Sequence, residues 1–182
     1  MSRVAIVTGA ARGIGAATVD ALVNDGYRVI AVDRCRDIPE VPYALATSAD
    51  LDAVVAHHGD TVLGLVGDVR SASDMQLAVE TATRHFGRLD AVVGLIRGTA
   101  MDLAPYGVTA NAVSPGSTRT ALLDASAKVY ELGSAEVFAQ QQPIGRLIEP
   151  TEVASTIAWL CSPAASAITG ADVAVDGGMT VG

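Results

Sequence analysis

The chain has 182 residues, 50% of them hydrophobic, and a net charge of −8. This acidic balance argues against nucleic acid or an anionic membrane as a partner, because both select basic surfaces. The apolar start, residues 4–7, is too short for a signal-peptide core or a membrane span, and the two cysteines without CxxC spacing suit a reducing compartment, so we expect a soluble cytoplasmic protein.

Apolar, β-branched runs alternate with helix-like segments along the chain. The expected strands are residues 3–9, 27–33, 61–69, 89–93, 107–116 and 172–178. The expected helices are residues 14–23, 49–58, 71–86 and 150–160, and Ser71 with Asp74 makes a cap-like start to the third. This alternation predicts one α/β domain over residues 1–182, with a Rossmann-like, doubly wound parallel sheet covered by helices on both faces.

The first strand–helix junction carries a glycine-rich stretch, TGAARGIG. Its glycines allow a tight turn, close approach of the backbone to a pyrophosphate, and tight helix–strand packing. The start of the following helix offers free N–H groups and about half a positive charge to phosphates. The residues of this loop that we expect to bind a nucleotide are Gly9, Arg12, Gly13, Ile14 and Gly15.

Asp33 ends the second expected strand, eighteen residues after Gly15. A carboxylate at this point accepts hydrogen bonds from the diol of an adenosine ribose and repels a 2′-phosphate. Arg12 and Arg34 are the competing signal, because nearby arginines can receive that phosphate. We predict NAD as the cofactor, since Asp33 occupies the ribose position itself; the alternative role for Asp33 is that of a loop acid or helix cap.

The sequence resembles a short-chain dehydrogenase/reductase over nearly its whole length. TGAARGIG is similar to the TGxxxGxG motif of that family, and FGRLD is similar to the lead into its fourth strand. GDV, residues 67–69, resembles the place where an Asp and its neighbour flank the adenine. The resemblance therefore implies that Asp68 and Val69 contact the adenine of the cofactor.

Two further segments extend this resemblance. NAVSPGSTRT, residues 111–120, is similar to the segment whose backbone and side chains hold the nicotinamide carboxamide, which implies that role for Pro115, Thr118 and Thr120. The long connection over residues 34–48 resembles that of the mycofactocin-associated subgroup, which implies an unusually enclosed NAD. The family implies hydride transfer between NAD and a small alcohol or ketone, by a homo-oligomer.

One block of the family pattern is absent. In the family, the fourth strand is followed by a helix, a strand carrying a catalytic Ser, and a helix carrying Tyr-x-x-x-Lys, the second half of which resembles AVVGLIRGTAMDLAPYG. Here Leu89 and Asp90 lead directly into that second half, so the join lies between Asp90 and Leu95. We therefore expect a sheet that lacks one central strand and helix. The strand at Val108 to Val113 then either pairs with the strand at Leu89 to Val93 or leaves a gap.

The catalytic pair can be checked by counting. The chain has four tyrosines and one lysine, Lys128, and no tyrosine is followed four residues later by lysine. We interpret Tyr106 as a packed turn residue, and Lys128 and Tyr130 as solvated. We therefore predict that this chain contains no catalytic residue.

The three histidines, His57, His58 and His85, stand near the ends of expected helices. A metal site needs three or four converging ligands, and no partner is spaced in sequence to help them. We therefore predict no metal site.

Three hypotheses stay open. The first is an NAD-dependent alcohol or carbonyl oxidoreductase whose central block is missing only from the present sequence. The second is a 182-residue chain that binds NAD(H) without turnover, as a pseudoenzyme, sensor or subunit partner. The third is a deletion product without a stable function.

Overall fold

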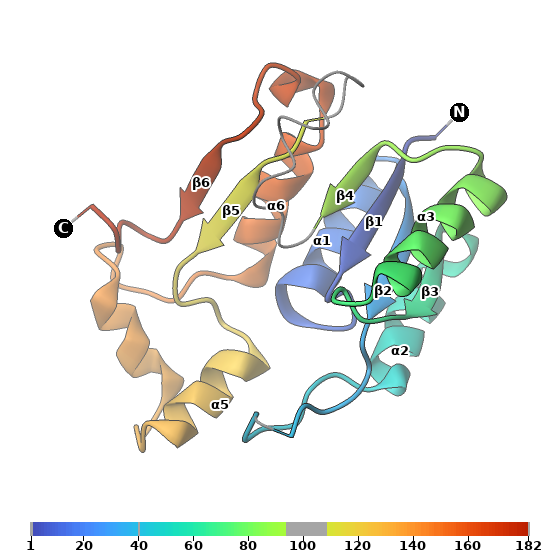
Figure 1. The fold of residues 1–182 in the computed structure, drawn as a ribbon. Coiled ribbons are helices and arrows are strands. Elements are labelled where there is room, and N and C mark those ends of the chain that lie inside the picture. Colours follow the sequence, from blue (N-terminus) through green and yellow to red (C-terminus); the bar gives the residue numbers. More distant parts are fainter. Residues whose placement is uncertain (1, 40, 94–108, 182) are drawn as a thin grey trace. The chain divides into compact units, whose positions relative to one another are not determined.

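The computed structural model describes residues 2–39, 41–93 and 109–181 (Figure 1). The chain forms two compact units, Met1–Leu95 and Ile96–Gly182, and each is described by itself. None of the helices among the described residues combines the length and apolar content needed to cross a bilayer. The prediction of a single domain over residues 1–182 stays a prediction.

Unit 1 contains a four-stranded, fully parallel sheet in the order β3-β2-β1-β4. Its elements are β1 (Val4–Thr8), α1 (Gly13–Asn24), β2 (Arg28–Asp33), α2 (Ser48–His58), η1 (Gly59–Thr61), β3 (Val62–Val66), α3 (Ala72–Phe86) and β4 (Ala91–Val93). Right-handed crossovers between parallel strands place α1 and α2 on one face of this sheet and α3 on the other (Figure 1). The carboxyl ends of the strands therefore meet at one edge, where loops can build a ligand site.

The core of unit 1 follows from the apolar character of its central strands. On the α3 face, side chains at alternate positions of β1 and β2 pack against the small residues of the helix, as expected for a strand period of two. The buried members of this cluster are Val4, Ile6, Ile30, Val32, Ala78 and Ala82. The intervening strand residues Ala5, Val7, Val29 and Ala31 are also fully buried, which explains why these strands are apolar throughout.

The helix boundaries of unit 1 have local causes. At the start of α3, the Ser71 hydroxyl oxygen accepts a hydrogen bond from the Asp74 N–H at 3.2 Å, which confirms the predicted cap. Thr47 and Asp50 form a reciprocal capping box at the start of α2. Helix α3 ends at Phe86, and the next residue, Gly87, has a φ of +80°, the left-handed conformation that glycine adopts most easily.

Unit 2 has a two-stranded parallel sheet of β5 and β6. Its elements are β5 (Ala112–Pro115), α5 (Ala121–Val129), η3 (Ala135–Gln141), α6 (Pro150–Leu160), η4 (Pro163–Ala165) and β6 (Asp172–Val175). The predicted helix over residues 150–160 is confirmed at both ends, with proline in its first turn. Asn111 precedes β5, and its side chain donates to the Ile168 carbonyl and accepts from the Ala171 N–H.

Strand β5 corrects one predicted boundary. The strand begins at Ala112, later than the predicted start at residue 107. Residues 107 and 108 lie outside the described residues, and residues 109–111 are not in a strand; the Asn111 side chain there bonds the Ile168 carbonyl and the Ala171 N–H. Within the described residues of unit 2, β5 pairs with β6. The choice between a shifted pairing with β4 and a gap stays a prediction. Tyr106 also lies outside the described residues.

Candidate functional site

The glycine-rich loop joins the carboxyl end of β1 to the start of α1. Gly9 and Gly13 have φ values of +66° and +60°, which side-chain-bearing residues rarely adopt. At Gly15 the limit is space, because a Cβ atom built there would lie 2.0 Å from the carbonyl oxygen of Gly9. The loop therefore brings the first turn of α1 directly against the end of β1.

The amino terminus of α1 differs from those of several other described helices. Its N-cap residue, Arg12, makes no side-chain capping hydrogen bond, and its first turn contains no acidic residue. By contrast, α2, α3 and α5 are capped by the side chains of Thr47, Ser71 and Thr120. The end of α1 therefore keeps its positive dipole charge and N–H groups for an anion.

The Asp33 carboxylate lies beside this loop, at the carboxyl end of β2. Its Oδ2 accepts the Ala11 N–H at 3.1 Å, and its Oδ1 accepts the Cys35 N–H at 3.1 Å. These two hydrogen bonds orient the carboxylate, and each oxygen keeps a further lone pair for a ligand hydroxyl. The structure thus brings together the glycine loop and Asp33, which the sequence analysis assigns to one cofactor.

The two arginines named as competing phosphate ligands are both engaged within unit 1. Arg12 Nη2 donates to the Ala44 carbonyl at 2.9 Å, which ties the loop over residues 34–48 to the glycine loop. Arg34 Nε lies 3.3 Å from Asp68 Oδ2 as an ion pair. Arg34 Nη1 is buried and has no hydrogen-bond partner among the described residues, so it can still donate to a polar ligand.

Asp68 is the centre of an arginine cluster that the sequence analysis missed. Arg70 Nε lies 3.0 Å from Asp68 Oδ1, Arg70 Nη2 lies 2.7 Å from Oδ2, and Arg36 is a third, more distant partner at 3.9 Å. These Arg70 hydrogen bonds, together with the Arg70 N–H and the charges of Arg70 and Arg34, hold the pKa of the Asp68 carboxyl well below its ordinary value. The only local signal was the Asp-x-Arg spacing. The neighbouring Val69 presents an apolar side chain that is 58% exposed.

The predicted nicotinamide ligands lie together in unit 2. Pro115 ends β5, and the buried Thr118 donates its hydroxyl to the Gly116 carbonyl at 3.0 Å. Thr120 is the N-cap of α5, and its hydroxyl oxygen accepts the Leu123 N–H at 3.3 Å. The Thr118 oxygen thus keeps acceptor capacity and the Thr120 hydroxyl keeps its donor.

The structure corrects the premise on which a metal site was ruled out. Asp20 of α1 lies beside His57 and His58 of α2, with Asp20 Oδ1 2.7 Å from His58 Nε2. The sequence analysis did not identify Asp20 as a partner, because Asp20 is on α1 whereas the two histidines are on α2. Among the described residues these three form a group that could hold a metal ion.

Two segments of the chain match models of known protein families. Residues 3–93 match the family model described as short chain dehydrogenase, and residues 91–180 match a model described as enoyl-(acyl carrier protein) reductase. The two matches meet at residues 91–93, inside the interval from Asp90 to Leu95 in which the sequence analysis places the join.

Two curated relatives are similar to this chain over different lengths. An uncharacterized oxidoreductase of Mycobacterium tuberculosis is 28% identical over 260 aligned positions, covering 97% of this chain and 95% of the relative. Because that alignment is longer than the 182-residue chain, the relative has residues without a counterpart here. A tropinone reductase homolog of Arabidopsis thaliana is 39% identical over 118 residues, covering 65% of this chain and 44% of its own length.

Solved structures confirm the Rossmann-like α/β fold. Carveol dehydrogenase from Mycobacterium avium, in complex with NAD, has a TM-score of 0.89 at 18% identity and covers 99% of this chain and 98% of its own. A short chain dehydrogenase from Mycobacterium paratuberculosis bound to NAD has a TM-score of 0.84 at 22% identity, with coverage of 99% and 98%. At these sequence identities the structural likeness establishes the fold alone.

Proposed function

The chain belongs to the short-chain dehydrogenase family, and we propose that it binds NAD(H) but does not turn over an alcohol or ketone in its 182-residue form. The single observation that carries the cofactor assignment is the Asp33 carboxylate, held beside a glycine loop that leads into the uncapped end of α1. A pyrophosphate at that helix end and a ribose diol on Asp33 would satisfy both features.

The described residues fit a dinucleotide. The positive φ of Gly9 and Gly13 and the absence of a side chain at Gly15 leave the backbone open to close approach by phosphate oxygens. Arg12 is the N-cap residue of α1, and Ile14 lies in the first turn of that helix. The buried, unpartnered Nη1 of Arg34 is a donor that a polar group of the ligand can use.

The preference for NAD over NADP rests on charge. A 2′-phosphate at the ribose position would lie against the Asp33 carboxylate and be repelled. The two arginines that could compensate are already partly engaged, Arg12 Nη2 with the Ala44 carbonyl and Arg34 with the Asp68 carboxylate, which offsets its charge. We therefore propose NAD as the physiological cofactor.

Two further groups complete the proposed ligand set. We propose that Val69, an exposed apolar side chain, packs against the adenine, while the Asp68 cluster holds the loop after β3 in place. On unit 2, we propose that Pro115, Thr118 and Thr120 bind the nicotinamide carboxamide. The carboxamide offers both a donor and an acceptor, which match the free acceptor of Thr118 and the free donor of Thr120.

The proposed lack of turnover rests on proton transfer. NAD supplies the hydride acceptor, but the alcohol proton must also leave through a positioned acid–base group. No tyrosine of the chain has a lysine four residues later, the spacing that puts both side chains on one helix face. We propose that a version with the central block restored would be an oxidoreductase for a small alcohol or ketone, cytoplasmic and homo-oligomeric.

The test is a fluorescence titration with NADH and NADPH. We expect tighter binding of NADH, and a smaller difference between the two cofactors in Asp33→Ala. Asp37→Ala is the matched control, because Asp37 accepts the Leu45 N–H at 2.7 Å in the exposed connection and should leave the ratio unchanged. Equal or tighter binding of NADPH by the unmodified chain would refute the assignment.

A further inference from the structure

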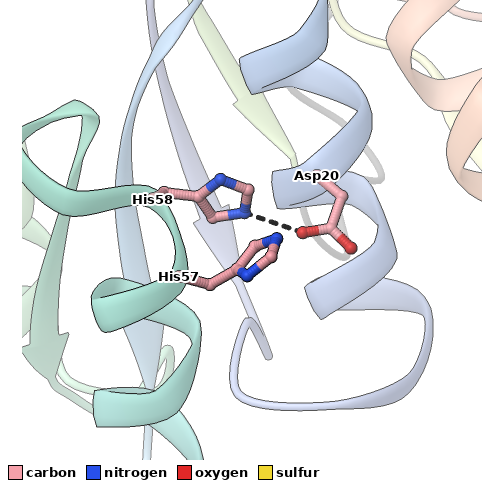
Figure 2. A group of neighbouring side chains, drawn as sticks. All are labelled: Asp20, His57 and His58. Atoms are coloured by element: carbon pink, nitrogen blue, oxygen red, sulfur yellow. Dashed lines mark hydrogen bonds and ion pairs between the residues drawn. The ribbon is translucent and has the colours of Figure 1, made fainter.

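A second cluster of ligand-type side chains lies on the α1–α2 face of unit 1. Figure 2 shows Asp20 on α1 facing His57 and His58 at the end of α2. Asp20 Oδ1 is 2.7 Å from His58 Nε2, and the two imidazole rings are 4.7 Å apart in an edge-on arrangement. One ligand atom from each of the three residues lies within 4.8 Å of the others.

Tertiary structure, rather than sequence proximity, assembles this cluster. Consecutive crossovers place α1 and α2 side by side on one face of the sheet, so that Asp20 meets residues 37 and 38 positions later in the chain. Helix α2 ends at His58, where Gly59 has a φ of +55° and turns the chain into η1. The histidines therefore project from a fixed helix end and not from a mobile stretch of loop.

The electrostatic setting favours a cation. The carbonyl end of α2 carries about half a negative charge, and Asp20 adds a full one. The His58 side chain is 10% exposed and that of Asp20 is 56% exposed. An ion bound here would be enclosed on the His58 side and would keep access to water on the Asp20 side.

Two imidazoles and one carboxylate form a ligand set that zinc uses when it keeps an open position for water. Bonds of about 2.0–2.2 Å in a tetrahedral arrangement put neighbouring ligand atoms roughly 3.4 Å apart. The separations within the group, from 2.7 Å to at most 4.8 Å, bracket that distance. We propose that Asp20, His57 and His58 bind one divalent transition-metal ion of the zinc class, and that the ion cross-links α1 to α2.

Binding replaces one contact. The hydrogen bond between His58 Nε2 and Asp20 Oδ1 gives way to two metal bonds, one from each atom, and the neutral imidazole of His58 then carries its ring proton on Nδ1. The ion stabilises the folded unit because the unfolded chain does not bring the two helices together. The site is separate from the glycine loop, since Asp20 lies in the second half of α1 and the loop at its start.

The decisive experiment is calorimetric titration of the untagged, metal-free chain with zinc chloride. We expect one ion per chain, a thermal unfolding midpoint that rises with zinc concentration, and at least a tenfold loss of affinity in Asp20→Asn and in the double variant His57→Ala/His58→Ala. His85→Ala is the matched control, because His85 stands in the last turn of α3 and should bind and unfold as the parent does.

Two further readouts keep the test independent of folding defects and of NAD binding. Cobalt(II) in place of zinc should give the intense visible bands of a four-coordinate site in the parent chain and in His85→Ala only. NADH affinity should be unchanged in the double variant. Absence of stoichiometric binding, or zinc retained by the double variant through Cys35 or Cys161, would overturn the proposal. Should the double variant not fold, Asp20→Asn, which keeps the size of the side chain, decides the question.

Discussion

Replacing Gly15 by alanine is the sharpest test of how the glycine loop works. The added Cβ would lie 2.0 Å from the Gly9 carbonyl oxygen and 2.6 Å from its carbonyl carbon. Ordinary carbon–oxygen contacts are about 3.3 Å or longer, so α1 or the Gly9 peptide must move by about 1 Å. Both partners are backbone, and no side-chain rotation relieves the overlap. We expect the free energy of unfolding to fall by about 1–3 kcal/mol, the usual cost of overpacking a close-packed interior.

The same displacement should weaken cofactor binding, because it moves the helix end that faces the pyrophosphate. We expect at least a tenfold loss of NADH affinity in Gly15→Ala, measured by fluorescence, alongside urea denaturation followed by circular dichroism. Gly133→Ala is the matched control, since a Cβ there meets no atom within 4 Å and the backbone has an ordinary φ. If Gly15→Ala matches the parent in both stability and NADH affinity, close helix–strand packing is not the reason for glycine at this position.

Three other predictions concern catalysis, pH and capping. The 182-residue chain should show no NADH-linked turnover of a panel of alcohols and ketones, whereas a version with a family-type central block restored should; robust turnover by the short chain would contradict the proposal. Hydrogen bonds from Arg146 and the Glu149 N–H lower the pKa of Glu152 to about 2 from its ordinary 4.5, so its stabilising contribution is present above pH 4.5 and is lost as the pH falls towards 2. Because the pair is exposed the effect should be small, and Glu152→Gln should flatten the fall of the urea midpoint between pH 5 and 3. Ser71→Ala should lower the free energy of unfolding by about 1 kcal/mol through loss of the α3 cap, and an unchanged urea midpoint would count against that role.

The features that the sequence predicted correctly are those with a local cause. The apolar runs of β1 and β2 mark strands buried on both faces, and a glycine-rich stretch between a strand and a helix marks the loop. The cap at Ser71 and the proline-led start of α6 at Pro150 depend on residues within one helical turn. Each of these can be found from neighbouring positions, because the forces that cause them act over one turn of a helix or one strand.

The prediction that the family's catalytic block is missing rests on which residues the sequence contains. Counting tyrosines and lysines needs no coordinates. The join between Asp90 and Leu95 could be placed because the two flanking segments have recognisable patterns, and the family matches meet in the same interval.

Tertiary structure alone decided the contacts between residues far apart in the chain. The meeting of Asp20 with His58, the packing of Arg34 on Asp68, and the pairing of β5 with β6 each depend on how separate elements are laid beside one another. No periodicity or spacing encodes such distances, because they are set by sheet order and crossover direction. Charge and ligand chemistry were present in the sequence, but only the fold determined which of these groups could act together.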